Sequence, residues 1–217
     1  MDNFINSKDP FFEVLFSRRS IRRLEQVPVS RETIEKAILA GCYAPSVTNK
    51  QPWQFYIVTK KSDIDDIAKR VTEELEKVAN MADTAQHSVL ASMIRNFDRY
   101  TTFFKDAPAI IIVATADYQT ELTRFLDSID YPDKWSVEGL KSTCMAAQNI
   151  LLALWRIGYG TCIMSSPVQL VEDFIKNKFN IPPNLSIVFL ITVGKPVEIP
   201  LRAPKRKALN EILHWCD

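Results

Sequence analysis

The chain has 217 residues, of which 47% are hydrophobic, and its 27 basic and 26 acidic side chains give a formal net charge of +1. This balance excludes a global field that would attract nucleic acid or an anionic membrane, so a phosphate-binding site has to be local. No apolar run reaches the roughly 18 residues of a membrane span and no secretory leader pattern is present, so we expect one cytoplasmic domain over residues 1–217.

The sequence shows no pattern typical of a metal site or a disulfide framework. The two histidines, His87 and His214, are far from a metal-ligand spacing. None of the four cysteines belongs to a Cys-x-x-Cys pair, and we expect reduced, mostly buried thiols at Cys42, Cys144, Cys162 and Cys216.

A short apolar helix is predicted over Pro10–Phe16, and it leads directly into the basic run Arg18-Arg19-Ser20-Ile21-Arg22-Arg23. On an extended segment alternate side chains diverge, which places Arg18, Ser20 and Arg22 on one side and Arg19 on the other. Such a cluster suits a phosphate ester. The alternative is a solvated basic face.

The next predicted helix is capped by Ser30 and runs to about Tyr43, and a strand follows over Trp53–Val58. Pro45 and Pro52 disfavour helical geometry in the residues before them. We therefore expect the backbone between the two prolines to be extended, with amide and hydroxyl groups free to face a ligand.

Two amides in this loop, Asn49 and Gln51, can each donate and accept hydrogen bonds. A planar heterocycle that alternates donors and acceptors along one edge would suit them. The alternative is an ordinary connection whose polar residues bond only their own backbone.

Two amphipathic helices are predicted next, one from Ser62 and one from Thr84 to Phe104. The broad apolar face of the second suits core packing, with a subunit interface or the wall of an aromatic pocket as alternatives. Pro108–Ala114 is typical of a central strand covered on both faces. The polar excursion from Asp117 to Trp135 is predicted to be a mobile loop or short helix, of a length often found in lids or substrate-facing segments.

The longest helix is predicted from Ser136 to Ile157 and is ended by Gly158, with a packed side formed by Leu140, Cys144, Ala147, Leu151, Leu154 and Trp155. A short strand follows over Tyr159–Met164, and Ser166–Gln169 matches a capping box with proline at the first helical position. After a buried strand over Leu185–Val193, the tail becomes basic at Arg202, Lys205, Arg206 and Lys207, which forms a second candidate phosphate site.

Several common catalytic motifs are absent from the sequence. There is no Gly-x-Gly-x-x-Gly and no Walker motif, and the chain contains only 5 glycines. Neither histidine stands beside a nucleophile-elbow sequence, so Ser-His-Asp catalysis is poorly supported. If the protein is an enzyme, we expect its reactive group to come from a cofactor, with no catalytic acid or base assigned to a side chain.

Four segments together resemble the FMN-dependent nitroreductase family of NAD(P)H oxidoreductases. The first is Arg18-Arg19-Ser20-Ile21-Arg22, and the second is Ala44-Pro45-Ser46 with Asn49-Lys50-Gln51-Pro52-Trp53. The others are Gly158-Tyr159-Gly160-Thr161-Cys162 and Arg206-Lys207-Ala208-Leu209-Asn210-Glu211. Each segment alone is weak evidence, but their order and spacing fit nearly the full chain.

The resemblance implies an α+β fold with a mostly antiparallel central sheet flanked by helices, in an intertwined homodimer that exchanges a C-terminal strand. It also implies two FMN sites at the subunit interface, each built from both chains. Arg18, Ser20 and Arg206 would hold the phosphate and ribityl chain, and Arg22 would lie near the pyrimidine end. The implied cofactor-binding set is Arg18, Arg19, Ser20, Arg22, Pro45, Ser46, Val47, Asn49, Gln51, Ile163, Met164, Ser165, Lys205 and Arg206.

The function that the resemblance implies is hydride transfer from NADH or NADPH to a small aromatic acceptor, a nitroaromatic or a quinone, by a ping-pong mechanism. Ser165 and Ser166 depart from the acidic residue and glycine of many members, which affects the contact expected at flavin N5. The alternative from another class is a non-catalytic flavin-binding or interaction protein of the same fold. Bleaching of the flavin by NADH or NADPH without oxygen would separate the two.

Overall fold

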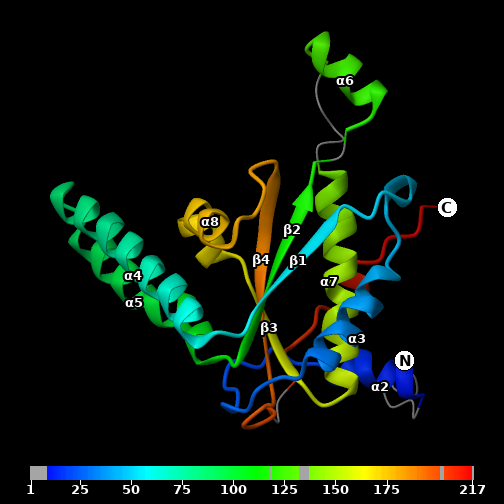
Figure 1. Cartoon of the computed structure of the whole chain (residues 1–217), viewed down its shortest axis with the longest axis horizontal. Helices are drawn as coiled ribbons and strands as arrows, with labels where there is room; N and C mark the ends of the chain where they lie inside the picture. Colours follow the sequence, from blue (N-terminus) through cyan, green and yellow to red (C-terminus); the bar gives the residue numbers. More distant parts are fainter. Residues whose placement is uncertain (1–8, 118, 132–136, 201–202, 217) are drawn as a thin grey trace.

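The computed structural model describes residues 9–117, 119–131, 137–200 and 203–216 (Figure 1). The strands are β1 (Trp53–Val58), β2 (Ala109–Ala116), β3 (Gly160–Met164) and β4 (Leu185–Gly194). The α-helices are α2 (Pro10–Ser17), α3 (Arg31–Cys42), α4 (Lys61–Thr84), α5 (Ser88–Thr101), α6 (Glu121–Ser128), α7 (Glu138–Arg156) and α8 (Ser166–Phe179). Short 3-10 turns are η1 (Val47–Asn49), η2 (Phe103–Asp106) and η3 (Leu209–Glu211).

The four strands form one antiparallel sheet in the order β1-β2-β4-β3, which confirms the predicted α+β class. Every residue from Ala109 to Thr115 of β2 is buried, as expected for a central strand. A β-bulge between Val113 and Ala114 shifts the register against β4. Beside this bulge the Ile187 N–H donates to Glu172 at 3.0 Å, so a side chain satisfies a backbone group that the ladder leaves unpaired.

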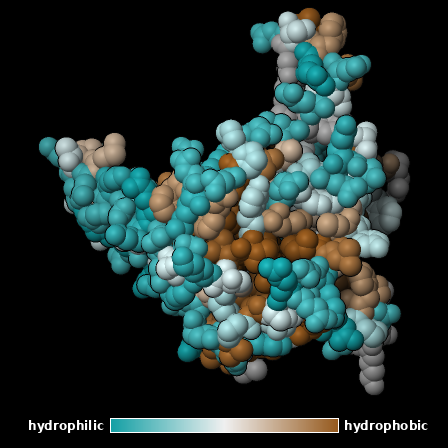
Figure 2. All heavy atoms as spheres, viewed as in Figure 1, coloured by the Kyte–Doolittle hydropathy of each residue, from teal (hydrophilic) through white to brown (hydrophobic). Residues whose placement is uncertain are grey.

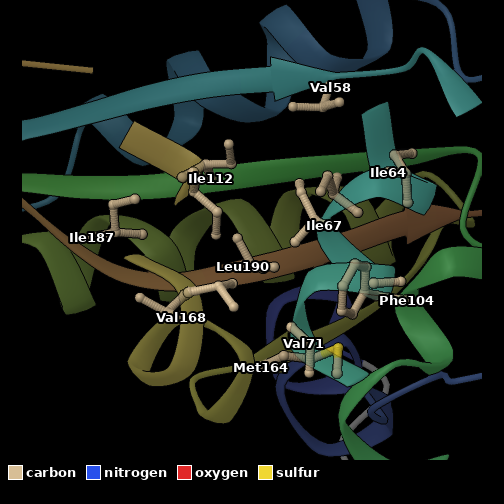
Figure 3. Close-up of a cluster of buried hydrophobic side chains, with 14 of the residues drawn as sticks. Val58, Ile64, Ile67, Val71, Phe104, Ile112, Met164, Val168, Ile187 and Leu190 are labelled. Carbon is tan, nitrogen blue, oxygen red and sulfur yellow. The ribbon is translucent and has the colours of Figure 1, made fainter. Parts of the chain in front are cut away.

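Helices cover both faces of the sheet. Successive β2 side chains point to opposite faces, and because they are apolar, both faces have to be buried. Ile112 faces α4 and α8, where it packs in a core with Ile67 and Val168 (Figure 3). Ile111 faces α3 and α7, where its core includes Ile150. The continuous apolar sequence of β2 is therefore explained by two separate cores.

Helix α3 forms as predicted. Ser30 is its N-cap and accepts the Thr33 N–H at 3.1 Å, and the helix ends at Cys42 with Tyr43 as the C-cap. Its buried side chains include Ile34 and Ala37, which lie in the core shared with α7.

The buried side of α7 agrees with the prediction at Ala147, Leu151 and Leu154 and differs from it at Leu140 and Cys144. Ser136, the predicted start of the helix, lies outside the described residues. Leu140 is 40% exposed and Cys144 is exposed, whereas the inward positions are Gly139, Ser142, Thr143, Ala146, Ala147, Ile150, Leu151 and Leu154. The reason is close approach to the sheet, because a Cβ on Gly139 would lie 2.4 Å from the Ala116 carbonyl oxygen. Small residues thus face the core at the start of α7. Gly158, with φ of 79°, follows the helix as predicted.

The helix expected from Thr84 to Phe104 is present but shorter, so both of its predicted bounds are wrong. Helix α4 continues through Thr84, the chain reverses at Gln86, whose φ is 64°, and α5 covers only Ser88–Thr101. No glycine marks this turn in the sequence, which explains the error. In Figure 1 the two helices form an arm beside the sheet. The inner side of the arm contains Ala79 and Ala91, and its outer side exposes Val89, Met93, Phe97 and Tyr100.

The excursion from Asp117 to Trp135 contains the short helix α6, in agreement with one of the two predictions. Tyr118 and residues 132–136 lie outside the described residues. None of the helices within the described ranges has the length and apolar character needed to cross a membrane.

The thiols only partly match the prediction. All four cysteines are free, but Cys144 and Cys216 are exposed and Cys42 is half-buried, so the expectation of mostly buried thiols is wrong. Over the same described ranges, no group of three or more His, Cys, Asp or Glu side chains could hold a metal ion.

Candidate functional site

The basic segment Arg18–Arg22 runs along β3. Ser20 forms a parallel bridge with Thr161, and the Ile21 N–H donates to the Thr161 carbonyl at 2.8 Å. Ile21 is only 2% exposed and packs against Gly160, where an added Cβ would lie 2.8 Å from the Ile21 Cβ. The segment is therefore extended and held by the edge of the sheet.

Three side chains of this segment gather around Cys162, as their alternation predicts. Burial raises the pKa of the Cys162 thiol, while the charges of Arg22 and Arg18 and the neighbouring Ser20 hydroxyl lower it. The Arg22 guanidinium carbon also lies 6.0 Å from the centre of the Phe103 ring, a weak cation–π contact.

The basic tail reaches the same place. Burial lowers the pKa of the Arg18 guanidinium, and the nearby positive charge of Arg206 lowers it further. Within the described part of the chain, no carboxylate lies at ion-pair distance from Arg18, Arg22, Lys205 or Arg206. Like charges at close range repel one another, and a bridging anion would remove this cost.

Arg19 points elsewhere, again as the alternation predicts. Its Nη1 donates to the carbonyl of Phe16 at 2.7 Å and to that of Arg18 at 2.8 Å, so the guanidinium caps the end of α2. Its Nε is buried and has no hydrogen-bond partner among the described residues, and the same is true of Thr161 Oγ1. Unpartnered buried polar atoms beside the basic cluster are consistent with a site that a polar ligand completes.

The loop Ser46–Gln51 contradicts the predicted extended backbone. It is a compact turn in which Thr48, Asn49 and Gln51 have φ values of 48°, 54° and 48°. Ser46 Oγ accepts the Gln51 N–H at 3.1 Å, and Gln51 Nε2 donates to Asn49 Oδ1 at 3.3 Å. These hydrogen bonds outweigh the preference that proline imposes on the residue before it. Asn49 and Gln51 nevertheless keep exposed side chains.

The junction of β3 and α8 presents Ile163 and Ser165 to solvent. Ile163 is 40% exposed, whereas the Met164 side chain is 6% exposed and packs in the core, so only the Met164 backbone is available here. The predicted capping box from Ser166 to Gln169 does not form. Helix α8 begins one residue earlier, with Ser165 at the N-cap, and the Ser165 side chain makes no capping bond.

The predicted site residues form two groups at opposite ends of α7 (Figure 1). Near the start of the helix, the Ser142 hydroxyl accepts the Val47 N–H of the loop at 3.3 Å. Near its end, Trp155 Nε1 donates to the Ser17 hydroxyl at 2.8 Å, directly before Arg18. At a rise of about 1.5 Å per residue, these two contacts lie about 20 Å apart along the helix. Within one chain, the loop and the arginine cluster therefore do not form one site.

One hollow in the described residues lies away from Arg18, Arg22 and Arg206, none of which lines it. It measures about 710 Å³, lies between α3 and the start of α4, and adjoins a second hollow of about 370 Å³. Both are lined by Ile34 and Glu35 of α3 and by Ile57 of the edge strand β1. Figure 2 shows this region as a hydrophobic band across the middle of the face.

Sequence reasoning missed three residues that contact the predicted ones: Phe103, Ser142 and Thr161. Ser142 and Thr161 are buried polar residues within regular elements, and Phe103 looked like part of an apolar helix face. No periodicity distinguishes them, because their partners are distant in the sequence. Only the packing of α7, β3 and η2 brings them to the site.

The comparisons with known proteins agree with the family resemblance found in the sequence. The nitroreductase family pattern matches residues 15–195. A relative from Methanothermobacter thermautotrophicus, named as a candidate NADH dehydrogenase/NAD(P)H nitroreductase, is 27% identical over 195 residues, which cover 89% of this chain and 81% of the relative. An iodotyrosine deiodinase of Nematostella vectensis is 25% identical over 94% of this chain and 74% of its own length.

Solved structures share the fold. A BluB-like flavoprotein from Clostridium difficile 630 superposes with a TM-score of 0.83 at 25% identity, covering 94% of this chain and 98% of that one. The NADPH:FMN oxidoreductase of Vibrio harveyi, solved with NAD+, has a TM-score of 0.67 at 17% identity and covers 96% and 78% of the two chains. With the family pattern matched over most of its length, this chain belongs to the nitroreductase family of oxidoreductases.

Proposed function

We propose that this protein binds FMN and passes a hydride from NADH or NADPH to a small aromatic acceptor, a nitroaromatic or a quinone, by a ping-pong mechanism. The observation that carries the proposal is that Arg18 and Arg206, from the two ends of the chain, lie close enough for their charges to interact. Among the residues that the structure describes, no carboxylate lies at ion-pair distance from either one. A phosphate monoester fits such a pair, because it is dianionic and accepts several charge-assisted hydrogen bonds.

The arginine cluster favours FMN over a flavin without phosphate. Arg18 and Arg206 would bind the phosphate together with the Ser20 hydroxyl, and Lys205 and Arg19 would add positive charge around it. Arg22 would lie toward the pyrimidine ring, where a cation stabilises the negative charge of a reduced flavin. When bound, the flavin supplies the hydride chemistry, and the protein supplies position and electrostatics.

The nicotinamide and the acceptor would use the same flavin face in turn. Ile163 follows Cys162 on β3, and Ser165 comes directly after the end of that strand. Their exposed side chains would line this face beside the arginines. The sequence offers no second nucleotide-binding motif, and hydride transfer requires close stacking. Sharing one face forces the first product to leave before the second substrate binds, which is the ping-pong order.

The site would be completed by a second copy of the chain. The loop carrying Pro45, Ser46, Val47, Asn49 and Gln51 lies about 20 Å along α7 from the arginine cluster of its own chain, so one chain cannot enclose a flavin with both groups. In a homodimer with two-fold symmetry, the loop of each subunit would reach the flavin held by the other.

The free edge of β1 provides a second argument for a homodimer. Strand β1 ends the sheet in the described residues, and the hollows beside it form a groove with both apolar and polar lining residues. The described tail beyond η3 has no regular structure and exposes Ile212, Leu213 and Trp215. An exposed apolar tail and an unpaired strand edge with a groove are complementary, so exchange of the tail between two copies would cover both.

Anaerobic titration of the purified protein with NADH and with NADPH tests the proposal. We expect one or both to bleach the flavin absorbance, and a nitroaromatic or a quinone to restore it. Because an iodotyrosine deiodinase is among the relatives, halogenated tyrosines belong in the same acceptor panel. Parallel lines in a two-substrate steady-state analysis would support ping-pong kinetics, and intersecting lines would refute the shared face.

A further inference from the structure

We propose that Ser142 is a positioning residue for the flavin site, because its buried hydroxyl on α7 holds the loop Ser46–Gln51 in shape through a hydrogen bond. The inference rests on the proposed function, in which this loop reaches the flavin of a second subunit. None of the four resembling segments includes Ser142.

The Ser142 hydroxyl links helix α7 to the loop through two hydrogen bonds. Ser142 Oγ donates to the Glu138 carbonyl of its own helix at 2.9 Å and accepts the Val47 N–H at 3.3 Å. The first bond orients the hydroxyl so that its lone pair faces the loop. Since Ser142 is 1% exposed, water cannot easily replace either bond.

The two ends of the loop are held by packing, whereas its middle depends on this hydrogen bond. Ala44 and Trp53, on either side of the loop, are buried against Ala146 of α7. Between them, the Val47 N–H to Ser142 Oγ bond is the one hydrogen bond that the described residues show from the loop to α7.

The loop requires such support because its backbone is strained. Thr48, Asn49 and Gln51 occupy the left-handed region without being glycine. Residues in that region persist only where the surroundings impose the conformation. Without the Ser142 bond, we expect the loop to sample other shapes, so that its polar groups meet the flavin less often in the correct geometry.

A double-mutant cycle on the full chain tests the inference. Ser142→Ala removes the acceptor, and Val47→Pro removes the N–H donor at the first position of a 3-10 turn, where proline is tolerated. Thr143→Val is the matched control, because Thr143 is also buried in α7 and its hydroxyl bonds Thr115 at 3.0 Å without touching the loop.

Two measurements are made on each variant. Hydrogen exchange of the apoprotein reports the loop amides at residues 46–51, and fluorescence titration with FMN reports cofactor affinity. We expect Ser142→Ala to speed exchange in the loop and to weaken FMN binding about fivefold, which corresponds to about 1 kcal/mol. The double variant should be no weaker than the weaker single variant, and Thr143→Val should keep wild-type exchange in the loop and wild-type affinity.

Three results would overturn the inference. These are unchanged loop exchange in Ser142→Ala, unchanged FMN affinity despite faster exchange, and strictly additive effects in the double variant. Failure of the proposed function is distinguishable, because it appears as an absence of FMN binding by the wild-type protein. Because Val47→Pro leaves the buried helix untouched, the loop can be tested even if Ser142→Ala folds poorly.

Discussion

Replacing Arg206 by alanine should have opposite effects on the empty and the FMN-loaded protein. In the empty protein, the charge of Arg206 lowers the pKa of Arg18, which means that the two guanidinium groups repel each other. No carboxylate is paired with Arg206 among the described residues, so the substitution breaks no ion pair there. We therefore expect the melting temperature of the apoprotein to stay constant or to rise slightly.

The loaded protein should lose a charge-assisted hydrogen bond to the phosphate, which is worth roughly 1.5 to 3 kcal/mol. This loss corresponds to a roughly ten- to hundredfold higher Kd for FMN. Riboflavin lacks the phosphate, so its affinity should change little. The effect should also shrink with rising salt, because Arg206 is exposed in the single chain.

Titration calorimetry with FMN and riboflavin, together with thermal melts of the apoprotein, measures these effects. Lys207→Ala is the control, because it removes the same charge from the next residue and Lys207 is also exposed. An equal loss of FMN affinity in both variants would mean that only general charge matters. A lower melting temperature for the Arg206→Ala apoprotein would refute the repulsion argument.

Three further predictions concern the fold and the dimer. Gly160→Ala should lower stability by about 1–3 kcal/mol and weaken FMN binding. The new alanine Cβ would come within 2.9 Å of three Ile21 atoms and displace the basic segment. An unchanged melting temperature and unchanged FMN affinity would contradict this prediction. Truncation after Glu211 should yield a monomer by light scattering that no longer retains FMN, and a dimer that still binds FMN would rule out tail exchange. Burial would raise the pKa of Glu172, but the hydrogen bonds from Lys176 and the Ile187 N–H lower this pKa overall. The Glu172 carboxylate therefore stabilises the folded protein fully above the ordinary glutamate pKa of about 4.3. This stabilisation is lost as the pH falls through the lower pKa of the folded state. Glu172→Gln should therefore be less stable than wild type at pH 7 and converge with it in acid, and a constant difference in urea unfolding down to pH 3 would disagree.

The sequence alone determined the elements whose signals are local. Ser30 marks the start of α3 because its side chain caps a backbone N–H three residues on, and Gly158 marks the end of α7 because it tolerates a positive φ. The apolar run in β2 predicted a strand covered on both faces, since alternate side chains need two cores. The alternation of Arg18, Arg19 and Ser20 likewise follows from the geometry of an extended chain.

Tertiary structure decided everything that depends on partners distant in the sequence. The buried side of α7 is set by close approach to β2, which selects small residues over the large ones that the apolar pattern favours. The left-handed turn at Thr48, Asn49 and Gln51 depends on hydrogen bonds within the loop and to Ser142, and these outweigh the local preference of proline. The four segments were recognisable in the sequence, but the pairing of the Arg18 segment with β3 and the path of the tail bring Arg18 near Arg206. Local preferences are weak compared with the packing and repulsion of groups that only the folded chain brings together.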